Sequence, residues 1–128
     1  MPLINLEAQP VVETPFGRWS PLNEPLELKA FGVNSIVCDP GEEFDIAHDE
    51  SETGHQEAYV VVSGRASFTI GDDRIEAGPG TVVSAPDPSA NRAYEALEPG
   101  TRIVCIGAAP GAAQPYGAWI DEDEPEGH

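Results

Sequence analysis

The chain has 128 residues and a mass of 13.6 kDa, which is the size of one domain with its own hydrophobic core. Its 23 acidic residues against 6 Lys or Arg give a net charge of −17. That charge excludes the basic stripe of a nucleic-acid-binding protein and disfavours anionic membrane surfaces. The 13 glycines and 13 prolines exclude a helical bundle and are typical of short strands joined by tight turns.

The N-terminal residues show no basic segment followed by an apolar run, so we expect no secretory signal and a cytoplasmic protein. No apolar stretch approaches the roughly 18 residues that a membrane-spanning helix needs. Cys38 and Cys105 lie in apolar, strand-like segments and form no CxxC or zinc-finger spacing. We therefore expect two buried free thiols.

Residues 1–26 contain prolines at short intervals, and this pattern predicts an extended arm. In one interpretation, the arm includes an edge strand. From there the chain alternates strand-like segments with turns, and the strongest strand signal is 57–63. We expect strands at 26–31, 33–39, 44–48, 57–63, 65–70, 74–77, 81–85, 92–96 and 101–107. Such a series without an amphipathic helix predicts an all-β fold, a β-sandwich or jelly roll. The expected divisions are an arm (1–26), a β-barrel (27–107), a surface segment (108–120) and an acidic disordered tail (121–128).

Two groups of residues stand at the spacings of known sequence motifs: Gly41, Glu57 and Gly64 form the first group, and Gly80 and Pro86 form the second. They resemble the two motifs of the cupins, a family of small double-stranded β-helix barrels. Each motif alone is a weak signal, but both in this order are typical of the family. The chain looks most like small bacterial cupins of uncharacterised function. The resemblance therefore implies a cupin-type jelly-roll barrel and no particular reaction.

The same resemblance supplies candidate metal ligands. Two of the four usual ligand positions of the family match, at His48 and Glu57, whereas Glu50 stands for the second histidine and Asn91 for the last one. His55 is a further candidate, because alternation places it on the same side of its strand as Glu57. These residues imply a Zn, Mn, Fe or Ni site with either Glu50 or His55 as the third ligand. The alternative is a vestigial site in which His48 hydrogen-bonds Glu57 or water.

The candidate lining of a pocket in the barrel comprises Phe44, Tyr59, Asn91 and Arg92. Core packing is the alternative role of the two aromatic residues. Arg92 lies beside the altered ligand position, where it pairs with Glu57 or Glu95 or contacts an anionic ligand. We expect a structural salt bridge. The acidic run between residues 39 and 57 is either a solvated face or a negative field that attracts cations.

The leading functional hypothesis is a small cupin that binds a small molecule in its barrel, with or without a divalent metal. The first alternative is a metal-dependent dioxygenase, isomerase or cyclase that acts on a small polar or aromatic substrate. The second is a metal-free sensory or partner-binding module. Nucleophilic catalysis is disfavoured, since the sequence holds no Gly-x-Ser-x-Gly segment. Exposed sheet edges and the long N-terminal arm favour a homodimer.

Overall fold

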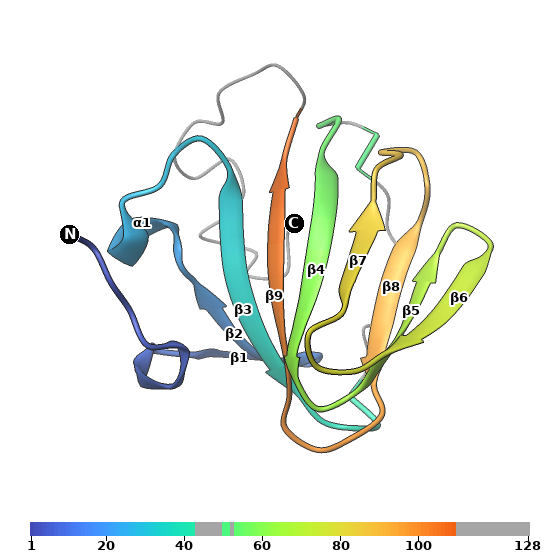
Figure 1. Cartoon of the computed structure of the whole chain (residues 1–128), viewed down its shortest axis with the longest axis horizontal. Coiled ribbons are helices and arrows are strands. Elements are labelled where there is room, and N and C mark those ends of the chain that lie inside the picture. The colour runs from blue at the N-terminus through green and yellow to red at the C-terminus, as the bar shows by residue number, and fades with distance from the viewer. Residues whose placement is uncertain (43–49, 52, 110–128) are drawn as a thin grey trace.

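The computed structural model of the protein describes residues 1–42, 50–51 and 53–109. Its regular structure is almost entirely β-strand (Figure 1). In chain order the elements are a short 3-10 helix (Leu6–Ala8), β1 (Val12–Thr14), β2 (Gly17–Pro21), α1 (Asn23–Leu26), β3 (Gly32–Cys38), β4 (Gln56–Ser63), β5 (Ala66–Ile70), β6 (Asp73–Ala77), β7 (Val82–Ala85), β8 (Arg92–Ala96) and β9 (Thr101–Ala108). Among these described residues, no helix is long and apolar enough to cross a membrane.

The strands form two antiparallel sheets. The larger sheet has the order β1-β2-β3-β9-β4-β7, and the smaller one has the order β6-β5-β8. In Figure 1 the long strands β3, β9 and β4 lie side by side, and the smaller sheet stands to their right. Some neighbours are far apart in sequence, because β9 returns to lie between β3 and β4. This arrangement confirms the predicted all-β jelly roll.

Alternation along the central strands decides which side chains enter the core. On β4 the buried positions include Tyr59 and Val61, and their neighbours Ala58 and Val60 face outward. The interior is filled by aromatic rings from both sheets, since Tyr59, Phe68 and Tyr94 have ring centroids 5.5 to 5.8 Å apart. The rest of the buried cluster is Ile36, Cys38, Val61, Ala66, Ala77, Val83, Ala85, Ala96, Ile103 and Cys105. Both cysteines are free and buried, as expected.

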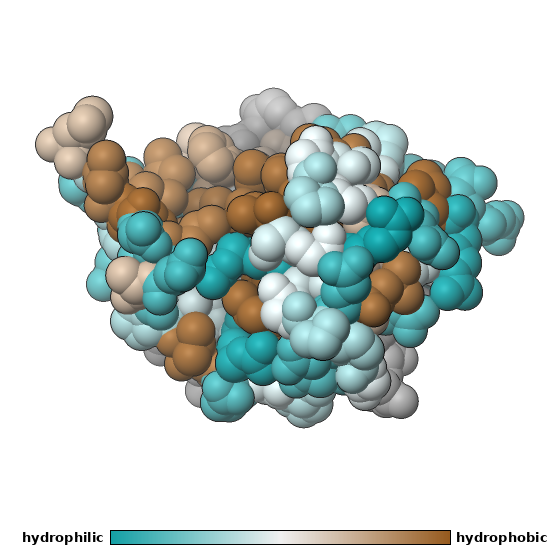
Figure 2. Space-filling model, turned by 60° about the horizontal axis from the view of Figure 1, so that its bottom comes forward, coloured by the Kyte–Doolittle hydropathy of each residue, from teal (hydrophilic) through white to brown (hydrophobic). Residues whose placement is uncertain are grey.

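The outward face of the larger sheet carries a row of valines. Val60, Val82 and Val104 lie in one row across β4, β7 and β9, and Val82 is 60% exposed. Figure 2 shows apolar side chains in a band that runs from the side of the N-terminal arm toward the middle of the molecule. The expected homodimer stays a prediction, because the structure describes one chain.

The junction between the expected arm and the expected barrel differs from its prediction. The expected strand at 26–31 is wrong, because α1 ends at Leu26 and Glu27 follows in the left-handed conformation at φ 57°. The side chain of Asn23 organises this turn: its Nδ2 donates to the carbonyls of Leu28 and Phe31, and its Oδ1 accepts from the Val33 amide. An asparagine side chain here substitutes for the backbone partners that a strand would need.

The edge strand in the arm is confirmed, since β2 pairs antiparallel with β3 and β1 pairs with β2. The expected strand at 44–48 lies outside the described residues. So do nearly all of the expected surface segment and the whole acidic tail, because the described residues end at 109.

Gly64 permits close contact between the β4–β5 turn and β9. Its φ is +78°, and a Cβ at this position would lie 2.7 Å from the Thr101 Cα. We therefore expect Gly64→Ala to lower the free energy of unfolding by about 2–4 kcal/mol in urea denaturation. Gly80→Ala is the control, because Gly80 has φ +85° with nothing within 4 Å of the added Cβ. It should cost only about 1 kcal/mol of backbone strain. Equal losses in the two variants would contradict the role of Thr101.

Candidate functional site

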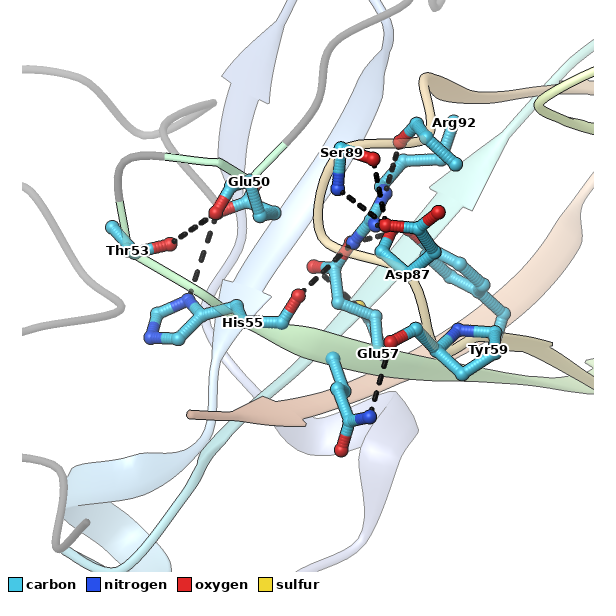
Figure 3. A network of polar contacts seen from close by, with 12 residues as sticks. Glu50, Thr53, His55, Glu57, Tyr59, Asp87, Ser89 and Arg92 are labelled. Carbon is cyan, nitrogen blue, oxygen red and sulfur yellow. Dashed lines mark hydrogen bonds and ion pairs between the residues drawn. The ribbon is translucent and has the colours of Figure 1, made fainter. Parts of the chain in front are cut away.

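A buried ion pair joins the two sheets at one end of the barrel (Figure 3). β4 contributes Glu57 and β8 contributes Arg92, whose Nη1 lies 2.9 Å from Glu57 Oε1. Their side chains are 0% and 1% exposed. The expected structural salt bridge is therefore confirmed with Glu57. Glu95, the other expected partner, pairs instead with Arg74 at 3.1 Å on the surface.

Two further groups contact the Glu57 carboxylate. The Tyr59 hydroxyl donates to Glu57 Oε1 at 2.6 Å, and the Cys105 thiol donates to Oε2 at 3.6 Å. Tyr59 follows Glu57 by two residues, on the same face of β4, and Cys105 is its cross-strand neighbour on β9. Both carboxylate oxygens thus have donors from the protein itself.

The donors near Glu57 stay protonated at neutral pH. Burial raises the pKa of the Tyr59 hydroxyl well above its usual value, and the negative charge of Glu57, together with that of Cys105 once its thiol ionises, raises the pKa further. Burial also raises the pKa of the Cys105 thiol, and the adjacent Glu57 carboxylate adds to the effect. Neither group is therefore an activated nucleophile or base, since a reactive thiol needs a lowered pKa.

Main-chain carbonyls hold the guanidinium of Arg92 in place. Its Nη2 donates to the Asp87 carbonyl at 2.6 Å, its Nε to the Ala90 carbonyl at 3.3 Å, and its Nη1 to the His55 carbonyl at 3.5 Å. The loop between β7 and β8 is in turn shaped by the Asp87 side chain, which accepts from the amide and hydroxyl of Ser89. These Ser89 hydrogen bonds lower the pKa of Asp87.

Glu50 and His55 form a second polar pair beside the first. Glu50 Oε1 lies 3.6 Å from His55 Nδ1 and accepts from the Thr53 hydroxyl at 3.0 Å (Figure 3). Both residues are buried, and the Glu50 amide donates to the Pro88 carbonyl at 2.7 Å. The structure thus brings these two predicted ligands together, next to the loop that holds Arg92.

Three predicted site residues remain. His48 and Phe44 are outside the described residues. Asn91, the residue at the last histidine position of the motif, is exposed, and its neighbour Arg92 takes the inward position at the start of β8. The residue that completes the site was thus one position further along the chain than the motif indicated.

The described residues fit a metal ion only in part. Glu50 and His55 supply a carboxylate and an imidazole, the donor types that Zn and Mn accept. Glu57 does not fit, because its carboxylate already accepts from Arg92 and Tyr59, and a divalent ion there would lie beside a fixed guanidinium. Within the ranges described, no three His, Cys, Asp or Glu side chains form a metal-binding group.

A groove of about 410 Å³ opens at the end of the larger sheet where β4 begins and β9 ends. Its lining is Phe31, Gln56, Glu57, Ala58, Ser84, Pro86, Ile106, Gly107, Ala108 and Ala109. Sequence reasoning missed it, because the outward Ala58, Ser84 and Ile106 come from three strands. Alternation predicts that Ala58 and Glu57 face opposite sides of β4. The pairing of β4 with β7 and β9, which places Ser84 and Ile106 beside Ala58, could not be predicted in this way.

No family model and no curated protein matches the sequence. Solved structures do match. A cupin protein from Bacteroides fragilis is 21% identical, with TM-score 0.65 over 86% of this chain and 89% of that one. KdgF from Halomonas sp. is 18% identical, with TM-score 0.66 over 81% and 88%.

A sugar phosphate isomerase of the cupin superfamily from Silicibacter pomeroyi is 17% identical, with TM-score 0.66 over 84% of this chain and 75% of that one. The chain spans only 59% of the length of a matched protein from Acidithiobacillus ferrooxidans, at 24% identity. Together with the two antiparallel sheets, these matches show that the chain has the cupin fold, the double-stranded β-helix of the cupin superfamily.

Proposed function

We propose that this protein is a small-molecule-binding cupin whose ligand occupies the groove at the end of the larger sheet. The observation that carries the proposal is the groove itself, of about 410 Å³. Ligand sites in proteins are concave, measure roughly 300–1,000 Å³ and combine apolar walls with a few polar groups. Phe31 and Ile106 supply apolar surface here, whereas Gln56 and Ser84 supply an amide and a hydroxyl.

The charges around the groove favour an uncharged ligand. Among the described lining residues the acidic one is Glu57, and its fully buried side chain pairs with Arg92. The chain as a whole carries −17, so the surrounding field repels anions. A neutral molecule with an aromatic or aliphatic part and one or two hydroxyl groups matches this lining best.

The structural neighbours support a small molecule as the class of ligand, because one of them is named for action on sugar phosphates. At 17% identity that likeness carries the fold, and it selects no particular substrate for this chain. The metal-dependent enzyme and the metal-free sensory module remain the alternatives, and a metal titration described below separates them.

Nuclear magnetic resonance with a matched pair of probes tests the groove. We expect benzyl alcohol, which is neutral, to shift the amide signals of Ala58, Ser84 and Ile106, and we expect benzoate to leave them in place. Ala58→Trp, which fills the groove from an outward position, should abolish the shifts. Val82→Trp is the control, because Val82 faces outward on β7 but does not line the groove.

The proposal is wrong if saturating benzyl alcohol leaves the three groove amides unchanged. It is equally wrong if benzyl alcohol shifts only interior amides such as that of Phe68, since the ligand would then enter the barrel.

A further inference from the structure

We infer that the guanidinium of Arg92 is a built-in cation that takes the place of a divalent metal ion at Glu57. The inference goes beyond the proposed groove and does not depend on it. It starts from the disagreement between the ligand positions of the motif, which include Glu57, and the contacts that Glu57 makes in the structure.

Arg92 occupies an inward position in the barrel. On β8 the buried residues are Arg92, Tyr94 and Ala96, so Arg92 opens the inward row of this strand. It pairs across the smaller sheet with Ile70, which partly packs against the core. A cationic side chain thus enters the interior at the place where the motif brings its last ligand.

The charges of Glu57 and Arg92 balance each other. Glu57 and Arg92 are both almost fully buried, and together they are neutral. A buried carboxylate needs a cation or several donors to offset its desolvation, and Arg92, Tyr59 and Cys105 provide both. A divalent ion added at Glu57 would give this buried ion pair a net charge of +2, and burial weakens the screening of that charge by solvent.

Hydrogen bonds to the main chain hold the Arg92 guanidinium in its position. Three main-chain carbonyls, of His55, Asp87 and Ala90, accept hydrogen bonds from its guanidinium. Displacement by a metal would break these three hydrogen bonds, although the Asp87 carbonyl also accepts from the Ala90 amide at 3.0 Å.

A gain of metal binding is the expected result when this cation is removed. Arg92→His replaces the guanidinium by an imidazole and releases the Glu57 carboxylate, with Glu50 and His55 close by. We expect the variant to bind Zn²⁺ more than about 100-fold tighter than the native chain in isothermal titration calorimetry. Adding Glu57→Gln to that variant should remove the gain.

The chain offers a matched control. Arg74 and Glu95 form the same kind of pair on β6 and β8, at 3.1 Å, but their side chains are 67% and 57% exposed. Arg74→His therefore makes the same substitution at the surface. It should leave Zn²⁺ affinity within about threefold of the native value, since an exposed histidine gains no convergent ligands.

A further test does not depend on the folding of Arg92→His. Equimolar Zn²⁺ should leave the amide signals of Glu57, Tyr59 and Cys105 in place, and Glu57→Gln should leave Zn²⁺ affinity unchanged. Shifts at these three amides, together with weaker binding by Glu57→Gln, would overturn the inference. So would a folded Arg92→His variant that binds Zn²⁺ no better than Arg74→His.

Discussion

Arg92→Met is expected to lower the free energy of unfolding by about 3–5 kcal/mol, because it leaves the Glu57 carboxylate buried without its cation. Among the described residues, the carboxylate would retain the Tyr59 and Cys105 donors. Three carbonyls would also lose hydrogen bonds from the guanidinium. Urea denaturation of the native and variant proteins measures the difference directly.

A second substitution separates the charge from the packing. Arg92→Met combined with Glu57→Leu removes both charges and should be more stable than Arg92→Met alone, since no unpaired charge remains. Arg74→Met is the surface control and should cost less than about 1 kcal/mol, because exposed pairs contribute little. If the double variant were as unstable as the single one, loss of the carbonyl hydrogen bonds would be the main cost.

Stability is also expected to fall steeply in alkaline solution. Burial raises the pKa of Tyr59, Tyr94 and Cys105 well above their usual values, and it raises the pKa of Cys38 to about 12. The unfolded chain releases protons near pH 9.0 from thiols and near pH 10.0 from tyrosines, whereas the folded chain retains them. The unfolded state then binds fewer protons, so the free energy of unfolding decreases as pH rises.

Each of the four groups contributes a slope of at most about 1.4 kcal/mol per pH unit. Their contribution is fully present below pH 9.0 and is lost as pH rises, with the loss from Cys38 complete near pH 12. Urea midpoints between pH 8 and pH 11 measure the slope. Tyr94→Phe keeps the ring and removes one titrating group, so its slope above pH 10 should be shallower by about 1.4 kcal/mol per unit. An unchanged slope would contradict the assignment.

Sequence alone predicted the barrel because its signals are local. The alternation in residues 57–63 and the glycines at turns follow from the backbone geometry of strands, and the structure shows both. The strand expected at 26–31 was wrong because one side chain, that of Asn23, organises a loop across ten residues. Such a contact leaves no periodic trace in the sequence.

The site was predicted less well for a related reason. A motif counts residues along the chain, whereas the inward position on β8 is set by its pairing with β5, which turns Arg92 inward and leaves Asn91 exposed. The salt bridge between Arg92 and Glu57 could be anticipated, since a buried carboxylate needs a partner. The groove could not, because its outward residues come from strands whose order in the sheet is not local information.

The inward arginine of β8 also has a consequence for the evolution of such barrels. The arginine codons CGU and CGC become histidine codons by one base substitution. A gene that encodes Arg92 by either of them is therefore a single mutation from a barrel with an imidazole at that inward position. Lineages could gain or lose a metal centre by this step while the strands, turns and aromatic core stay the same. Comparison of this codon among natural variants would show which direction the change has taken.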